Sequence, residues 1–283
     1  MRPRDPRAVT STENAAVKHA RALERDRTLR ERDGAYVAWG LHLAQEALRA
    51  GAPVRRAFVG TRLQESREGQ SLLQDLSAAG VPILRTTTRI LDSVVEGSGD
   101  QGILLLCDRP QQAPSRLLGR QASLVLAAHG VQDPGNFGSI LRSALALGAS
   151  GLVALPGCTD PYGSRAVRAA MGALFALPVA AVEIEEFLDR ARDSSLQIVA
   201  ADPAGAKTPP EVDLRPPTIL LVGSEGGGLP GSLLDAARHR VRVPMARGTE
   251  SLNVHAASVA LLYETARQRG FRFGADLSEG SDR

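Results

Sequence analysis

The chain has 283 residues, of which 43% are apolar and 23% charged, a composition typical of folded globular proteins that excludes wholesale disorder. The length suits two domains of about 100–200 residues each. With 34 Lys and Arg against 31 Asp and Glu, the net charge is only +3, which neither demands nor excludes a polyanionic partner.

The sequence predicts neither a disulfide framework nor a membrane-spanning segment. The two cysteines, Cys107 and Cys158, are too few for a disulfide framework and lack the spacing of metal ligands. The polar N-terminus lacks the apolar core of a secretory signal, and no apolar run approaches the ~18–20 residues of a membrane span. We therefore expect a cytoplasmic protein with no membrane association and no metal site.

Strands and helices alternate along the N-terminal hundred residues. Short apolar runs predict strands at 35–39, 54–59, 81–84 and 103–107. Apolar residues at helical spacing predict helices at 41–50 and 72–79, each followed by a glycine that ends it. This pattern indicates a small α/β sandwich of about 100 residues. Its first 35 residues carry nine Lys and Arg, which suit a solvated helix face as well as an RNA contact.

A polar segment with two prolines then separates this region from a second alternating region. Further strands are predicted at 123–128, 152–155, 178–182, 196–201 and 218–222, and helices at 136–147, 164–175 and 254–269. Strands separated by helices imply a mostly parallel sheet. We therefore predict a first domain at 1–108, a linker at 109–119, a second domain at 120–272 and a flexible tail at 273–283.

A glycine-rich loop, 223–231, follows directly on the predicted strand 218–222. Glycine has no Cβ, so such a loop lets the backbone approach a ligand closely, although a tight turn uses the same residues. The glycines formally match a dinucleotide fingerprint, but that motif opens the first helix of its domain, and here Pro230 lies inside it. A nicotinamide-dependent oxidoreductase is therefore not favoured. Glu225 within the loop is either a solvated turn residue or a partner for a ligand hydroxyl or an arginine.

Two further segments place short polar side chains where helices are predicted to begin. Asn136 is predicted to cap one helix, and Asn253 the last one. Arg142 lies six residues after Asn136, about 9 Å along the axis, and its side chain leans back toward the helix start. Helix capping accounts for each asparagine taken separately, and Arg142 could be an ordinary surface arginine. These explanations account less well for all three segments, the glycine-rich loop and the two that contain Asn136 and Asn253, occurring in this order in one chain.

Taken together, the three segments fit one set of motifs. The first motif pairs Asn136 with Arg142, the second is Gly-x-Glu-Gly-x-Gly-Leu over 223–229, and the third is Pro-Met at 244–245 followed by Ser-Leu-Asn-Val at 251–254. This combination resembles the SpoU (TrmH) family of RNA ribose 2′-O-methyltransferases in the SPOUT superfamily, over about residues 120–270. The N-terminal hundred residues resemble, more loosely, the L30e-type RNA-binding domain of ribosomal-RNA members.

The resemblance implies an α/β fold in two parts. The C-terminal domain would be a SPOUT α/β knot, in which a deep trefoil knot is built on a mostly parallel sheet, and the N-terminal domain a small L30e-like sandwich that binds the RNA substrate. Family members work as homodimers, with site residues drawn from both subunits. Knots are exceptional in proteins, and no periodicity in a sequence indicates one.

The resemblance also implies the reaction. The methyl group of S-adenosylmethionine would be transferred to a ribose 2′-hydroxyl without a metal, and 23S ribosomal RNA is favoured over transfer RNA as the substrate. Self-protection against a ribosome-targeting antibiotic is equally compatible. A non-catalytic RNA-binding homologue is the alternative, against which the complete set of motif residues argues.

The resemblance implies roles for eight residues of this sequence. The implied catalytic residues are Asn136, Arg142, Glu225, Ser251 and Asn253, and the implied cofactor contacts are Gly223, Val243 and Leu252. Arg142 would act as a base or, more easily in physical terms, as an electrostatic stabiliser, because a guanidinium is normally always protonated. His255, where the family has a small residue, departs from the pattern, and a packed histidine at the helix start is favoured there.

Overall fold

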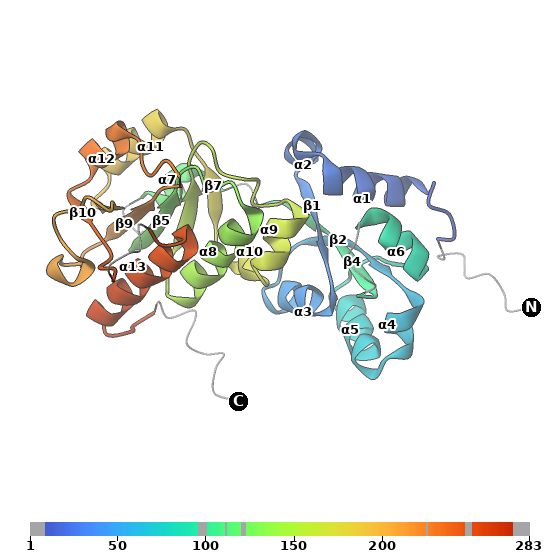
Figure 1. Ribbon diagram of the computed structural model, residues 1–283. Helices are drawn as coiled ribbons and strands as arrows, with labels where there is room; N and C mark the ends of the chain where they lie inside the picture. The colour runs from blue at the N-terminus through green and yellow to red at the C-terminus, as the bar shows by residue number, and fades with distance from the viewer. Residues whose placement is uncertain are drawn as a thin grey trace, which may run out of the picture. The chain divides into compact units, whose positions relative to one another are not determined.

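The structure is a computed structural model that describes residues 9–95, 101–110, 112–119, 123–224, 226–246 and 251–273 (Figure 1). The chain forms two compact units. The first comprises residues 1–111 together with 162–176, and the second comprises 112–161 together with 177–283. The glutamate of the glycine-rich loop, Glu225, and residues 274–283 of the predicted tail lie outside the described residues.

A four-stranded mixed sheet is the centre of the first unit. Its strands occur in the order β1-β4-β2-β3, with bounds Ala35–Trp39 for β1, Val54–Val59 for β2, Ile83–Arg85 for β3 and Ile103–Asp108 for β4. The β2 and β3 strands are parallel, and the other pairs are antiparallel. The four strands that the apolar runs predict are therefore all present.

Six helices of the N-terminal segment accompany this sheet. They are α1 Ala15–Arg25, α2 Arg27–Asp33, α3 Leu41–Arg49, α4 Thr61–Glu65, α5 Arg67–Ala78 and α6 Thr88–Val94. Side-chain caps define several of their starts, since Asn14, Asp26 and Ser66 each accept a hydrogen bond from a backbone N–H of the following turn. Only α3 and α5 were predicted, because the apolar stripe of α1 is diluted by charged residues.

Segment 162–176 packs within the first unit, although it follows the second region in the sequence. The helix predicted at 164–175 is two short helices, α9 Ser164–Ala169 and α10 Ala173–Ala176. The break falls at Met171 and Gly172, whose φ angles of 49° and 94° are left-handed. A left-handed residue ends an α-helix, which explains why the apolar pattern continues while the helix does not.

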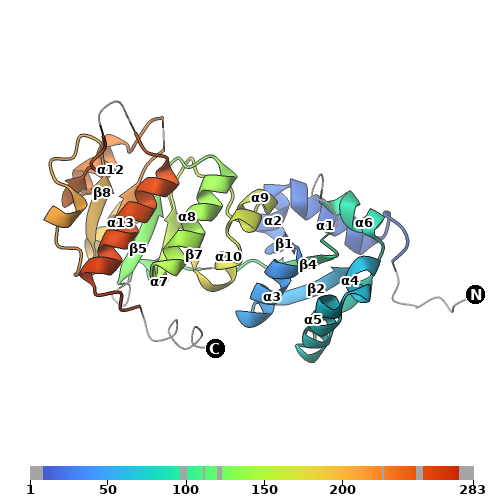
Figure 2. The same ribbon diagram turned by 60° about the horizontal axis from the view of Figure 1, so that its bottom comes forward.

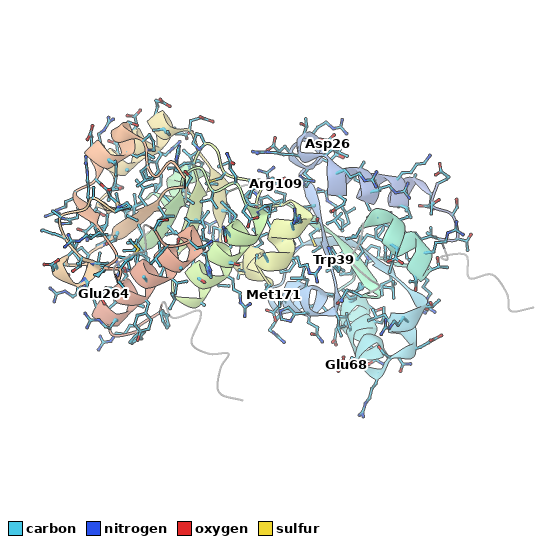
Figure 3. The ribbon with its side chains drawn as sticks, viewed as in Figure 1. Asp26, Trp39, Glu68, Arg109, Met171 and Glu264 are labelled. Atoms are coloured by element: carbon cyan, nitrogen blue, oxygen red, sulfur yellow. The ribbon has the colours of Figure 1, made fainter. Side chains whose placement is uncertain are left out.

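Aromatic and cation–π contacts hold this segment in the first unit. Figure 3 labels two of the first unit's residues that take part, Trp39 and Arg109. The Arg168 guanidinium lies 4.7 Å from the Trp39 ring centroid, and Arg109 lies 4.8 Å from that of Tyr162. The Tyr162 ring is also 5.0 Å from the Tyr36 ring, which is almost fully buried. Each guanidinium therefore lies over an aromatic ring, and the attraction between the cation and the ring stabilises this arrangement.

A six-stranded, entirely parallel sheet is the centre of the second unit. The strands occur in the order β10-β8-β9-β5-β6-β7, with bounds Leu124–Ala128 for β5, Gly151–Ala154 for β6, Val179–Ala181 for β7, Gln197–Ala201 for β8, Thr218–Val222 for β9 and His239–Val241 for β10. The central strands are buried on both faces. The predicted α/β fold with a mostly parallel sheet is confirmed.

Helices cover both faces of this sheet. The helix α8, Pro134–Ala146, packs against α13, Val254–Gln268, and Figure 2 shows the two side by side. The opposite face is covered by α7 Pro114–Leu117, α11 Ile184–Asp193 and α12 Gly231–Ala236. Both α11 and α12 went unpredicted, as did β10. No helix among the described residues has both the length and the apolar character needed to cross a membrane.

Replacing Phe187 by alanine tests the packing of α11 on the sheet. The Phe187 side chain is fully buried in the core beneath α11, so Phe187→Ala should lower the free energy of unfolding by about 3–5 kcal/mol. The neighbouring Leu188 is only partly buried, and Leu188→Ala should cost less than about 2 kcal/mol. Urea unfolding followed by circular dichroism measures both, and equal losses would contradict the described core.

Candidate active site

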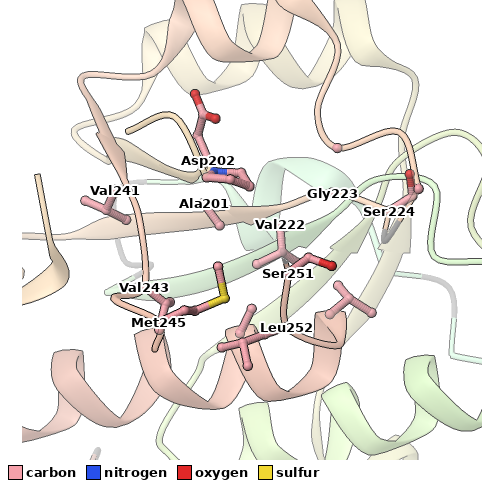
Figure 4. A pocket seen from close by; sticks show the side chains of 15 residues that line it. Ala201, Asp202, Val222, Gly223, Ser224, Val241, Val243, Met245, Ser251 and Leu252 are labelled. Atoms are coloured by element: carbon pink, nitrogen blue, oxygen red, sulfur yellow. The ribbon is translucent and has the colours of Figure 1, made fainter. Parts of the chain in front are cut away.

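A pocket of about 280 Å³ opens at the carboxyl edge of the parallel sheet (Figure 4). Because β10, β8 and β9 are adjacent and parallel, their last residues, Val241, Ala201 and Val222, meet at one edge and line the pocket. Ligands of open α/β sheets bind at this edge. The remaining wall comes from the loops that follow these strands and from the start of α13.

Sequence segments that carry the second and third motifs meet in this pocket. Gly223, Val243 and Leu252, the three residues implied as cofactor contacts, line it, as does Ser251. Met245 lies beside Leu252 and closes the apolar side (Figure 4). The arrangement therefore places four of the eight implied site residues around one cavity.

Several lining residues were missed by the motif comparison. They include Ala201, Asp202, Pro203, Val222, Val241 and Ala257. The Asp202 carboxylate accepts a hydrogen bond from the backbone N–H of Ala204, 2.9 Å away, and so shapes the turn after β8. The available signal was topological, since the ends of strands adjacent to β9 must lie near its loop, but strand order is not readable from apolar runs.

The glycine-rich loop is both a tight turn and a pocket wall. A Cβ on Gly223 would lie 2.4 Å from the backbone carbonyl group of Gly228, so the two backbones approach too closely for a side chain. The Ser224 hydroxyl accepts a hydrogen bond from the N–H of Gly227 at 3.1 Å and fixes the turn. At Gly226, which lines the pocket, a Cβ would meet no atom within 4 Å. The loop thus presents uncovered backbone to a ligand.

The first motif reaches the third through its asparagine. Asp133 caps α8 by accepting a 2.7 Å hydrogen bond from the N–H of Asn136, so the prediction that Asn136 caps this helix is wrong. The freed Asn136 side chain accepts a 3.1 Å hydrogen bond from the Asn253 amide. Asn253 caps α13 as predicted, accepting from the N–H of His255 at 2.9 Å.

Arg142 lies on the exposed surface of α8 and is not among the pocket-lining residues. Its side chain forms no hydrogen bond or ion pair with any other residue of the described ranges. The next residue, Ser143, contacts the Nε2 atom of His255 through its hydroxyl at 2.9 Å. The turn of α8 that carries Arg142 therefore lies beside the start of α13.

Two histidines near the site, His129 and His255, are partly buried. Burial lowers the pKa of His255 and also that of His129, where a hydrogen bond to the Gly228 carbonyl opposes the effect. The Nδ1 atom of His129 is buried without a partner among the described residues. Among the residues that the structure describes, no three His, Cys, Asp or Glu side chains are grouped so that they could hold a metal ion.

Comparison with known families gives two matches that together cover most of the chain. Residues 123–263 match the SpoU rRNA methylase family, and residues 37–113 match the family described as RNA 2′-O ribose methyltransferase substrate binding. A similar curated protein is the 23S rRNA (uridine(2479)-2′-O)-methyltransferase of Streptomyces viridochromogenes, 30% identical over 93% of each chain. An uncharacterized tRNA/rRNA methyltransferase of Synechocystis is 31% identical over 94% of this chain and 95% of its own.

Solved structures agree with these matches. An AdoMet-bound rRNA methyltransferase from Sinorhizobium meliloti superposes with a TM-score of 0.82 at 30% identity, covering 92% of this chain and 97% of its own. The SpoU methyltransferase AviRb from Streptomyces viridochromogenes, in complex with AdoMet, gives 0.81 at 29% identity, covering 90% and 98%.

Fold, pocket and sequence relatives thus define an RNA methyltransferase. The chain belongs to the SpoU rRNA methylase family. The family predicted from the three motifs is confirmed, and so is the enzyme class.

Alanine substitutions at Gly223 and Gly226 should show which of the two glycines the fold of the loop requires. The Cβ of Gly223→Ala would collide with backbone, and we expect it to lower the free energy of unfolding by about 1–3 kcal/mol. Gly226→Ala, with open space around its Cβ, should change it by less than about 0.5 kcal/mol. Thermal unfolding compares the two, and a Gly223→Ala protein as stable as Gly226→Ala would refute the close approach.

Proposed function

We propose that this enzyme transfers a methyl group from S-adenosylmethionine to a ribose 2′-hydroxyl, with 23S ribosomal RNA as the favoured substrate. The observation that carries the proposal is the single pocket into which the second and third motifs converge, with the first motif joined to it by the Asn136–Asn253 hydrogen bond. Two relatives described as bound to AdoMet, and one named for 23S rRNA 2′-O-methylation, support it. An enzyme for ribosomal RNA would act in the cytoplasm.

The pocket suits the adenosine part of this cofactor. Its volume of about 280 Å³ is near the lower end of the ~300–1,000 Å³ found for small-molecule sites, and such sites combine an apolar lining with a few polar groups. Val243 and Leu252 would supply the apolar walls, and the backbone at Gly223 would supply hydrogen bonds to the base. When bound, the cofactor supplies a methyl group already activated on a sulfonium, so the transfer needs no metal.

Arg142 would act on the other reactant. Negative charge would develop on the 2′-oxygen as its proton passes to solvent, and a fixed guanidinium would stabilise that charge. Arginine also binds a phosphate through two parallel hydrogen bonds, which would hold the adjacent nucleotide. Ser251, Asn136 and Asn253 would orient the ribose. The role of Glu225, in maintaining the loops, is proposed on the resemblance alone.

The working unit is proposed to be a homodimer that shares its sites. Exposed aromatic side chains gather where α13 ends, since Tyr263 is 53% and Phe271 45% exposed, with ring centroids 5.6 Å apart. Exposed apolar patches of this kind mark interaction surfaces. A second copy packed there would cover these rings, and it would also explain why Arg142 lies outside the lining of its own pocket.

The RNA would be held by the first unit, which matches the substrate-binding family. Three of the nine Lys and Arg in the first 35 residues, Lys18, Arg27 and Arg32, are already paired with nearby carboxylates. A different set of arginines is available. Arg62 and Arg89 are exposed and form no hydrogen bond or ion pair within the described ranges.

These two arginines follow parallel strands, so the fold gathers them at one edge. Arg62 comes three residues after β2 ends and Arg89 four residues after β3 ends, and the ends of β2 and β3 are in register, with Val59 opposite Arg85. Positive side chains at one edge of a sheet fit the phosphates of a folded RNA, which proteins recognise largely by shape.

Arg142→Ala should greatly slow methyl transfer while leaving the affinity for S-adenosylmethionine nearly unchanged. We expect the rate of methyl transfer to fall at least about 100-fold, because the stabilising charge is lost, while the affinity for S-adenosylmethionine stays within about twofold. Tritium transfer to RNA and isothermal titration measure the two quantities. Arg192→Ala on α11, across the sheet, is the control and should match the wild type. Normal turnover by Arg142→Ala would remove this residue from the mechanism.

Combined Arg62→Gln and Arg89→Gln should weaken RNA binding electrostatically. A plot of log affinity against log salt concentration falls less steeply when phosphate contacts are lost, by about one unit of slope for each contact. The double variant should therefore reduce the steepness by about two. Arg27→Gln, which removes an arginine already paired with Glu31, serves as the control with little change in slope. Filter binding to ribosomal RNA across a salt series gives these values. An unchanged slope in the double variant would show that the RNA lies elsewhere.

A further inference from the structure

Two hydrogen bonds between side chains join α8 to the start of α13. Asn136 accepts from Asn253 at 3.1 Å, and Ser143 contacts the Nε2 atom of His255 at 2.9 Å. Asn136 and Ser143 are seven residues apart, which is about two helical turns and places them on the same face of α8. Their partners are only two residues apart in α13. The start of α13 is therefore held against α8 at two points along that helix.

Residue 255 takes part in both connections. Its backbone N–H donates to the Asn253 side-chain oxygen at 2.9 Å, which leaves the Asn253 amide nitrogen directed at Asn136. Its imidazole makes the second connection itself. The backbone and the side chain of one residue thus orient the asparagine of the third motif and also hold the turn of α8 that contains Arg142.

The surroundings of His255 favour its neutral form. Among the elements packed on α13, Arg142 is the charged residue of α8, β9 carries none, and Glu211 of the short helix Pro209–Glu211 packs where α13 ends. Along α13 itself the nearest charge is Glu264, nine residues further. A second positive charge near Arg142 and at a helix N-terminus is unfavourable, and burial lowers the pKa of the imidazole.

We infer that His255 is a positioning residue for methyl transfer, which acts through Ser143 to hold the Arg142 turn of α8 in register with Asn253. The inference rests on the proposed function, because it assigns Arg142 and Asn253 to the reaction. Arg142 has no partner of its own in the described ranges, so the placement of its backbone depends on how α8 is held. A displacement of about 1 Å at a reacting group can cost up to about 100-fold in rate.

A double-mutant cycle on Ser143 and His255 tests this inference. We expect Ser143→Ala and His255→Ala each to lower kcat about tenfold, and the double variant to be no slower than His255→Ala, because both changes remove the same contact. Affinity for S-adenosylmethionine by titration should stay within about twofold. Ser150→Ala is the matched control, since within the described residues the Ser150 hydroxyl bonds the Leu124 carbonyl and nothing else. Its kcat should equal that of the wild type.

The conservative variant His255→Gln separates positioning from packing. Glutamine places an amide near the Nε2 position, so it should recover most of the rate at pH 8. The wild-type rate should fall at acid pH, where the imidazole becomes charged, and burial, which lowers the pKa of His255, should move this fall below the ordinary histidine range. This acid limb should be absent from His255→Gln. The NMR titration of the His255 ring, a readout independent of activity, should show a pKa below about 6.5 that changes in Ser143→Ala.

The outcomes distinguish this inference from the proposed function. If the wild type methylates RNA and Arg142→Ala does not, but the Ser143 and His255 variants keep the wild-type kcat and pH profile, the inference is overturned and the function stands. Additive losses in the cycle, or a fall in melting temperature without a fall in kcat, would also overturn it. If the wild type transfers no methyl group to RNA, the proposed function itself fails, whatever the ring titration shows.

Discussion

Parallel pairing of β8, β9 and β10 is the constraint on which the pocket depends. Parallel strands end at the same edge of a sheet, so this pairing brings together three segments that are separated by up to about 40 residues in the chain. Each strand is followed by a loop at that edge, and the remaining wall comes from Leu252, which precedes α13, and from the first turn of α13. Without this order of strands, the second and third motifs would be two unrelated surface turns.

Within that frame, different physical requirements determine the two sides of the site. On the proposed cofactor side, close backbone contact excludes a side chain at Gly223, and mostly apolar residues line the pocket. On the proposed substrate side, polar side chains bond one another between α8 and the start of α13, as Asn136 does with Asn253. The first arrangement makes a shaped apolar slot, and the second holds polar groups in fixed orientations near an exposed arginine. A methyl transfer requires both, because it joins an apolar-bound donor to a charged polymer.

The short segment 162–176 illustrates how packing overrides position in the sequence. It lies inside the stretch that matches the methylase family, yet its rings and arginines pack with Trp39, Tyr36 and Arg109 of the first unit. Buried aromatic surface and cation–π contacts outweigh sequence continuity there. The two ends of the segment nevertheless continue into the second unit.

Local patterns in the sequence were sufficient for the strands and for the longer helices. The apolar runs predicted β1 to β9, and the cap at Asn253 follows from a residue type that competes for free N–H groups. Charged helices such as α1 and α11 escaped prediction, because their apolar stripes are sparse and their stability comes from packing on the sheet. The knot implied by the resemblance stays a prediction.

The motifs determined by themselves which family the chain joins, and they named the candidate site residues, because residue type and spacing are properties of the sequence. Tertiary structure alone decided how these residues are connected. Asp133 rather than Asn136 caps α8, which frees Asn136 for Asn253, and His255 pairs with Ser143 across 112 positions of the chain. Contacts of this kind depend on how two helices pack on a shared sheet, and that packing is set by long-range burial that no local pattern encodes.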